Sequence, residues 1–340
     1  MKRNERLGGR LMSGFLSASA VLVILSVALP ASAARPYRVG IMLPGDEWLS
    51  SVDGFKEGMK ELGYLEGKTI RYLFDNARRD KTKIGEITER FVAEKVDAIF
   101  TITNTALKIV AQVTGPSKTP VVFGSASGPV ESGVMPAYAT PGAHVTGVTS
   151  GSLELVAKRL EILNEVLPRA KRIALIGDLE ADSSKAAFAL AEETAAKLGL
   201  TLVEFRVKSK AEAAEAAKGI TRKEADAIFL LPGLYVVGAV TDIAAAARAA
   251  RLPFAVYQVE HVKNDGGLLG YGSSYFLQGK QSAVLVDKIL KGVPVARLPI
   301  ERPRAHQLIL NLGTAREIGI VFSPEVLNRA DELVGADGKR

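Results

Sequence analysis

Two hydrophobic patterns alternate along the chain after residue 35. Short β-branched runs such as YRVGIML (37–43) are followed by longer segments in which apolar residues return every three or four positions, as in 48–63. The first pattern predicts strands covered on both faces, and the second predicts helices that cover them. This alternation is typical of an α/β fold with parallel sheets.

The predicted elements form two series with the same order. In the first series we expect strands at 37–43, 68–76, 96–102 and 119–125, and helices at 48–63, 84–95 and 105–114. In the second we expect strands at 171–178, 201–207, 225–232 and 252–258, and helices at 183–199, 211–224 and 240–251. The tetrapeptide DAIF occurs in the third strand of each series, at 97–100 and 226–229. We therefore predict two Rossmann-like lobes built on one plan, with DAIF in a buried central strand of each.

The first 33 residues follow a different pattern. Four basic residues in MKRNERLGGR precede the apolar run FLSASAVLVILSVALP, and Ala31-Ser32-Ala33 follows it. A basic segment, a short apolar run and a small-x-small site predict a cleaved signal peptide at 1–33. An uncleaved membrane anchor is the alternative, which the well-placed cleavage site disfavours. We expect the mature protein to start near Ala34 and to be free in a periplasm.

Composition excludes several function classes. The chain has 340 residues, a formal charge of +7 and no cysteine. Its length after the signal suits two domains. Removing the four basic residues and one acidic residue of the signal lowers the charge by three, and no basic run with interleaved aromatic residues follows, so no nucleic-acid partner is expected. Without cysteine, stability must come from a hydrophobic core rather than from disulfides.

Catalytic motifs are missing from the sequence. His144, His261 and His306 are widely separated, and the chain contains no H-E-x-x-H, Walker, G-x-S-x-G or G-x-G-x-x-G motif. We therefore expect no enzymatic activity, no metal and no cofactor. An exported α/β enzyme is a disfavoured alternative, because a fold does not dictate a function.

Candidate ligand-binding residues follow from the predicted sheets, because ligands of open parallel sheets bind at the carboxyl ends of the strands. The candidates in these loops are Asp46, Trp48, Thr103, Asn104, Thr105, Ser125, Ser127, Asp178, Tyr235, Gln258, Glu260, Tyr271 and Ser274. Trp48 either forms a wall of the site or packs between helices. Thr103, Asn104 and Thr105 offer hydroxyl, amide and helix N-terminal N–H groups, which suit a carboxylate or another acceptor-rich group, although such residues also cap helices.

Several phrases of the sequence resemble one protein family. They are GFKEGMKELGYLEGKTI, PVVFGSASGPVESGV, TPGAHVTGV, LEILNEVLPRAKRIALI, GGLLGYG, VDKILKGVPVARLPIERP and LILNLGTAREIGI. In this order they resemble ABC-transporter substrate-binding proteins with a type I periplasmic-binding-protein fold, a family with tryptophan- and tyrosine-binding members. The resemblance covers nearly all of the mature chain. It implies a monomer that holds a small molecule between two lobes and delivers it to an ABC permease in the inner membrane.

The resemblance also implies how the chain is divided. Lobe 1 is expected to contain 35–147 and 275–300, and lobe 2 to contain 148–274 and 301–335. The crossings between the lobes are expected near 146–151, 272–276 and 299–304. Closure of the lobes about such hinges would trap the ligand.

The chain departs from the family pattern where acidic residues are common. Gly128 is followed directly by Pro129 without the usual Asp, Gly233 replaces another Asp, and Ser273-Ser274 replaces Pro-Asp. His144 replaces an Asn. Acids in the cleft would pair with an α-ammonium group. Their loss favours a neutral or anionic small molecule, such as an aromatic or carboxylic acid, over an ordinary amino acid.

Some alternatives stay open at this point. Asp46 and Glu260 remain and could pair with a cation. A ligand-binding component of a membrane sensor would use the same fold and the same closure as an importer's binding protein. A cytoplasmic repressor with similar lobes is disfavoured by the export signal and by the missing helix-turn-helix segment.

Overall fold

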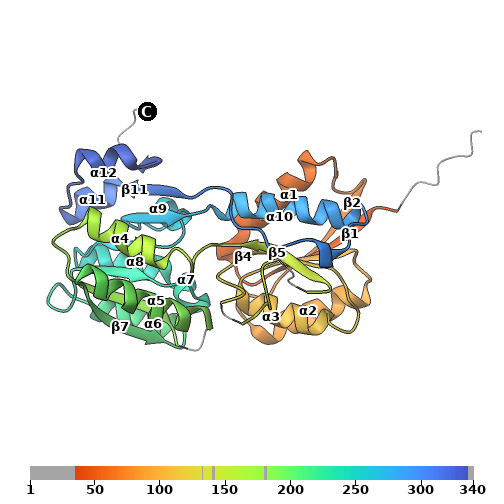
Figure 1. The fold of residues 1–340 in the computed structure, drawn as a ribbon, viewed down its shortest axis with the longest axis horizontal. Helices are drawn as coiled ribbons and strands as arrows, with labels where there is room; N and C mark the ends of the chain where they lie inside the picture. Colours follow the sequence, from red (N-terminus) through yellow and green to blue (C-terminus); the bar gives the residue numbers. More distant parts are fainter. Residues whose placement is uncertain (1–34, 132, 140–141, 180–181, 336–340) are drawn as a thin grey trace, which may run out of the picture. The chain divides into compact units, whose positions relative to one another are not determined.

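The computed structural model describes residues 35–131, 133–139, 142–179 and 182–335. These residues form a mixed α/β structure with two sheets, which confirms the predicted fold class (Figure 1). The strands of the first sheet are β1 (Tyr37–Leu43), β2 (Ile70–Asn76), β3 (Ala98–Ile102), β4 (Val121–Ala126) and β5 (Val145–Thr149). Those of the second are β6 (Arg172–Asp178), β7 (Thr201–Val207), β8 (Ala227–Leu230), β9 (Phe254–Val256), β10 (Leu269–Gly272), β11 (Gln307–Asn311) and β12 (Glu332–Val334).

The helices connect these strands in the predicted alternation. They are α1 (Leu49–Glu61), α2 (Lys81–Ala93), α3 (Asn104–Thr114), α4 (Val156–Val166), α5 (Asp182–Leu198), α6 (Lys210–Gly219), α7 (Leu234–Gly238), α8 (Val240–Ala249), α9 (Glu260–Asn264), α10 (Tyr275–Leu290), α11 (Leu312–Ile318) and α12 (Pro324–Arg329). Short 3-10 helices lie at Asp46–Trp48 and Val295–Arg297.

The two sheets repeat one topology. The first has the strand order β2-β1-β3-β4-β5, and the second contains β7-β6-β8-β9-β10 in the same order, extended by β11 and β12. Strand β11 is antiparallel to β10, whereas the other pairs are parallel. The register repeats as well, because Ala98 of β3 lies opposite Val39 and Ala227 of β8 lies opposite Ile173. This register confirms that the two halves share one plan.

The aspartate of each DAIF sequence has the same structural role. The Asp97 side chain accepts the backbone N–H of Arg38 at 2.8 Å, and the Asp226 side chain accepts that of Arg172 at 2.8 Å. In return, the backbone N–H of each aspartate donates to the carbonyl oxygen of the same arginine at 2.7 Å. DAIF therefore joins the start of the central strand to the first strand of each half.

Helices cover both faces of the first sheet. Helices α1 and α10 lie side by side on one face, and α2 and α3 cover the other (Figure 1). The pair α1 and α10 packs closely through two glycines: a Cβ atom at Gly54 would collide with the carbonyl oxygen of Phe276, and one at Gly279 with that of Ser51. Helix α10 follows β10 of the second sheet, so the chain returns here to the first sheet.

The second sheet is also buried on both faces. Ile173 and Leu175 of β6 belong to the cluster of buried residues that includes α4 and α5. Ala174 and Ile176 alternate with them and belong to the cluster that includes α6 and α8. Burial of successive residues on opposite faces explains why β6 is a continuous apolar run in the sequence.

Two of the expected crossings lie next to each other. Val148 forms a parallel bridge with Glu301, and the backbone N–H of Thr149 donates to the carbonyl oxygen of Glu301 at 3.0 Å. The third expected crossing, 272–276, joins β10 to α10. The division of the chain into two lobes at these positions stays a prediction.

A few elements differ from the sequence prediction. The helix expected at 211–224 ends at Gly219, because Ile220 adopts an extended conformation (φ −81°, ψ 117°) with its side chain buried. Helices α7 and α9 were not predicted, since five residues are too few to show a helical period. The predicted signal peptide lies outside the described residues. Within the described ranges, no helix has the length and apolar character needed to cross a membrane.

Candidate functional site

One pocket gathers residues from the carboxyl ends of strands in both sheets. The enclosed cavity has a volume of about 30 Å³, and the space around it, open solvent at the mouth included, amounts to about 410 Å³. It is lined by Trp48, Thr103, Asn104, Thr105, Ser125, Ser127, Gly233, Leu234, Tyr257, Gln258 and Tyr275. Seven of these, from Trp48 to Ser127 together with Gln258, are among the residues that the sequence singled out. The structure therefore brings together candidates that lie up to 210 positions apart, from 48 to 258.

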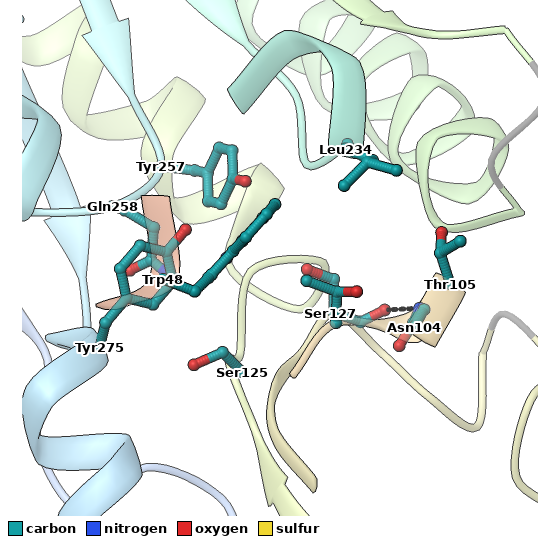
Figure 2. Close-up of a pocket in the computed structure, with 11 residues that line it drawn as sticks. Trp48, Asn104, Thr105, Ser125, Ser127, Leu234, Tyr257, Gln258 and Tyr275 are labelled. Atoms are coloured by element: carbon teal, nitrogen blue, oxygen red, sulfur yellow. Dashed lines mark hydrogen bonds between the residues drawn. The ribbon is translucent and has the colours of Figure 1, made fainter. Parts of the chain in front are cut away.

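An aromatic wall forms one side of the pocket. Figure 2 shows the rings of Trp48, Tyr257 and Tyr275 on this side, with Asn104 and Thr105 on the opposite side. The three aromatic residues are buried. Burial raises the pKa of Tyr257 and of Tyr275, so both hydroxyls are neutral and able to donate hydrogen bonds at physiological pH. A flat ring would find stacking and edge contacts here.

The opposite side is polar and is held in an unusual backbone conformation. Thr103, which ends β3 and caps α3, has φ 74°, and Ser125, near the end of β4, has φ 54°. Residues with a side chain seldom adopt positive φ, and such conformations are frequent at ligand sites. The side-chain amide of Asn104 donates to the carbonyl oxygen of Ser127 at 2.7 Å, which fixes the two loops against each other (Figure 2).

Gln258 offers the pocket a polar group with no protein partner. Its side chain is buried, and in the described part of the chain neither Oε1 nor Nε2 has a hydrogen-bond partner. A buried amide without partners costs free energy unless a ligand or a water molecule satisfies it. Gln258 can therefore donate to and accept from a bound molecule.

Two serines of the pocket support its walls. The Ser125 hydroxyl donates to Oε1 of Gln278 at 2.5 Å, which ties β4 to α10. The hydroxyl of Ser127 lies 3.1 Å from that of Ser150, beside the crossing that follows β5. Both contacts connect the pocket to the segments that join the two sheets.

The acidic candidates lie outside the pocket and have other partners. Asp178 accepts the backbone N–H groups of Tyr235 at 3.0 Å and Val236 at 3.1 Å, so it caps the start of α7. Asp46 accepts from the side chain of Asn76 at 2.6 Å, and Glu260 accepts the backbone N–H of Tyr275 at 2.5 Å.

Asp178 also explains the glycine at position 233. A Cβ atom at Gly233 would lie 2.5 Å from Cγ of Asp178, so no larger residue fits at this position. Burial raises the pKa of the Asp178 carboxyl to about 6, although the N–H groups of α7 oppose the shift. A buried carboxyl is therefore present behind Gly233, but it is bound to the protein's own backbone.

The remaining candidates, Tyr235, Tyr271 and Ser274, do not line the pocket either. The Tyr271 ring lies 6.0 Å from that of His306, and its carbonyl oxygen accepts from Arg159 at 2.8 Å. Ser274 caps α10 without a side-chain hydrogen bond. Their role in ligand binding, like that of the pocket residues, stays a prediction.

Four pocket residues were not selected from the sequence: Gly233, Leu234, Tyr257 and Tyr275. Tyr257 directly precedes Gln258, and Tyr275 directly follows Ser274, so the right loops were identified but not the right positions within them. The two tyrosines could have been found from the presence of an aromatic residue in a loop after a strand. No group of three or more potential metal ligands occurs among the residues with a described placement.

Two α/β halves with a pocket at the carboxyl ends of their strands define a type I periplasmic binding protein. The chain belongs to the ABC transporter substrate binding protein family, whose model matches residues 38–334. It is 24% identical to a tyrosine-binding protein of Clostridioides difficile over 265 residues, which cover 78% of this chain and 75% of that protein.

Solved structures have the same fold. The crystal structure of a conserved domain protein from Vibrio cholerae matches with a TM-score of 0.82 and 26% identity, covering 88% of this chain and all of that one. A protein from Streptococcus pneumoniae in complex with L-Trp matches with a TM-score of 0.79 and 21% identity, again over 88% of this chain and all of that one.

Proposed function

We propose that this protein captures a neutral or anionic small molecule with a flat ring in the pocket and delivers it to an ABC permease. The observation that carries the proposal is the division of the pocket into an aromatic side with Trp48, Tyr257 and Tyr275 and a polar side with Asn104 and Thr105. Such a pocket orients a ligand whose ring and polar end lie on opposite sides.

Two relatives support a ligand with an aromatic ring, but they do not support the proposed neutral or anionic charge. The tyrosine-binding protein and the protein in complex with L-Trp bind aromatic amino acids, whereas solved structures of 15–16% identity hold myo-inositol or 5-methylthioribose. An amino acid also carries an ammonium group, which a cleft carboxylate would stabilise. No carboxylate lines the pocket among its described residues. Asp178 accepts two backbone N–H groups, and Glu260 accepts one through Oε1, while its buried Oε2 has no partner in the described structure. The residues that line the pocket therefore favour an aromatic ligand that has no ammonium group.

Contacts between the two halves support closure around the ligand. Arg79, in the loop after β2, forms an ion pair with Glu47. A Cβ atom at Gly238 of α7 would lie 2.6 Å from Nε of Arg79, so Arg79 reaches across to the other half next to the pocket. We propose that ligand binding compacts the protein through such contacts, and that a permease recognises the closed state.

The place of action follows from the family and from the predicted signal peptide. We propose that residues 1–33 direct export and that the mature protein acts as a monomer in the periplasm.

The experiment is a thermal-shift screen of residues 34–340 against amino acids, aromatic acids, short carboxylates and sugars, followed by calorimetry of each hit. A binder raises the melting temperature by mass action. We expect aromatic acids or their neutral relatives to bind with micromolar or tighter affinity. If only cationic or zwitterionic amino acids stabilised the protein, the proposed ligand class would be wrong.

A further inference from the structure

A buried arginine stands close to the pocket without a direct ion pair to a carboxylate of the described residues. Arg159 lies in the first turn of α4 and is only 2% exposed. Its Nε donates to the carbonyl oxygen of Tyr271 at 2.8 Å. Nη1 and Nη2 are buried, and neither has a hydrogen-bond partner in the described structure.

The guanidinium is charged despite its burial. Burial lowers the pKa of Arg159 to about 9, which leaves the group protonated at neutral pH. Glu154 acts on this pKa in the opposite direction; its Oε1 accepts from the Tyr138 hydroxyl at 2.8 Å, and its buried Oε2 has no hydrogen-bond partner in the described structure. A buried charge without a paired and hydrogen-bonded partner is costly, and an anion that enters the site would offset this cost.

Two contacts place Arg159 beside the pocket. The guanidinium carbon lies 5.8 Å from the centre of the Tyr257 ring, and Tyr257 lines the pocket. The carbonyl oxygen that Nε binds belongs to Tyr271, four residues before Tyr275 of the pocket wall.

We propose that Arg159 is the anchor for a carboxylate of the ligand, so that the preferred ligands are aryl carboxylates. This inference rests on the proposed function and specifies its ligand class. Nε is bound to the carbonyl oxygen of Tyr271, so both Nη atoms remain available at the opposite end of the guanidinium. They can donate two parallel N–H bonds to the two oxygens of one carboxylate. The carboxylate reaches it past the edge of Tyr257.

The same arginine would couple the ligand to the crossing between the two halves. The carbonyl oxygen that Nε holds belongs to Tyr271 of β10, immediately before the 272–276 segment that leads into α10. A carboxylate bound to the Nη atoms would therefore fix the guanidinium against this segment.

The test compares matched acids and amides on the wild-type protein. The probes are phenylacetate with phenylacetamide, 4-hydroxybenzoate with 4-hydroxybenzamide, and indole-3-acetate with indole-3-acetamide, each measured by calorimetry. Since hydrogen bonds to charged groups are stronger than neutral ones, we expect at least one acid to bind about tenfold or more tightly than its amide.

Variants then assign the preference to one residue. Arg159→Gln should bring the acid-to-amide affinity ratio to about one, whereas Arg159→Lys, which keeps the charge without the planar fork, should lower acid affinity and leave amide affinity unchanged. Arg206→Gln is the control, because Arg206 also stacks on a ring, that of Phe188 at 4.0 Å, but lies outside the pocket. Thr105→Val tests the start of α3 as a competing anion site and should lower acid and amide affinity equally.

The outcomes separate this inference from the proposed function. If acids and amides bind equally, or if Arg159→Gln keeps the preference while Thr105→Val removes it, Arg159 is not the anchor and the proposed function stands. If circular dichroism shows that Arg159→Gln does not fold, the acid-to-amide affinity ratios of the wild type and of Arg159→Lys decide whether Arg159 is the anchor. If no acid or amide binds at all, the capture of a flat ring is contradicted, and the role of Arg159 with it.

Discussion

The two DAIF strands are alike along their length and different where they end. Strands β3 and β8 are fully buried, are each preceded by an aspartate that binds the neighbouring strand, and have the same register. After β3 comes Thr103, in a positive-φ conformation at the start of α3. After β8 comes Gly233, at the start of the short helix α7. The repeated sequence therefore builds the scaffold, whereas the residues that follow it, Asn104 after β3 and Leu234 after β8 among them, line the pocket.

The ends of the first strands differ in the same way. In the shared register, Pro44 follows β1 where Asp178 ends β6. Asp178 caps α7, whereas the loop after Pro44 leads into the 3-10 helix that carries Trp48. The two halves therefore use equivalent positions for a helix cap in one case and for the approach to an aromatic wall in the other.

The largest expected effect comes from removing the aromatic wall. Trp48→Ala should weaken binding of an aromatic ligand by about 2–4 kcal/mol, because a buried aromatic anchor typically dominates an interface. Phe74→Ala is the control in the same half, since Phe74 is 46% exposed and lies outside this pocket. Calorimetry of both variants measures the effect; equal affinities would show that the ligand does not contact Trp48.

A pH-dependent effect of a buried carboxyl should appear in the second half. The folded-state pKa of Asp178, about 6, lies above its ordinary value of 3.8, so the folded protein binds this proton more strongly than the unfolded chain does. The ionised carboxyl then costs stability above pH 6. Between pH 7 and pH 4 the wild type should gain up to about 3 kcal/mol relative to Asp178→Asn, whose amide does not titrate.

Urea unfolding of both proteins at the two pH values measures this difference, because other titrating groups cancel in the comparison. An identical pH dependence of wild type and Asp178→Asn would mean that the carboxyl is not desolvated behind Gly233.

Removing the side chain of Asp226 should destabilise the second half. Asp226 accepts two backbone N–H groups and the Arg172 side chain. The pKa of Asp226 falls to about 2 through its contact with Arg172. Asp226→Ala should therefore cost about 1–2 kcal/mol at pH 7, a figure reduced for partial exposure.

The sign of the pH dependence for Asp226 is opposite to that for Asp178. Because its pKa is depressed in the folded state, its stabilisation is present above about pH 4 and is lost as the pH falls toward 2. Denaturation of wild type and Asp226→Ala across this range checks the prediction. Equal stabilities of the two proteins at pH 7 would contradict it.

The smallest expected effect is on the polar wall. Thr105→Val keeps the shape of the side chain and removes one hydroxyl, so ligand affinity should fall by about 0.5–1.5 kcal/mol. Thr82→Val, in the first turn of α2 and outside this pocket, is the matched control and should bind the ligand as the wild type does. If Thr105→Val also bound the ligand with wild-type affinity, the Thr105 hydroxyl would not contact the ligand.

The sequence predicted the scaffold well because burial on both faces of a strand leaves a clear apolar run. It also identified loops that line the pocket, since the ends of parallel strands must meet at one edge. It did not distinguish Tyr275 from Tyr271, because a few residues of displacement decide whether a side chain enters the pocket or faces His306. It could not show that Asp178 and Glu260 are bound to backbone N–H groups, since these contacts depend on where α7 and α10 start.

The most direct test of the account uses the only tryptophan of the chain, which lines the pocket. A non-indole ligand from the thermal-shift screen is titrated while Trp48 emission is excited at the red edge of indole absorption. We expect a saturable change in intensity or wavelength with the same Kd as calorimetry. A ligand that binds by calorimetry and leaves Trp48 emission unchanged would show that the binding site lies elsewhere.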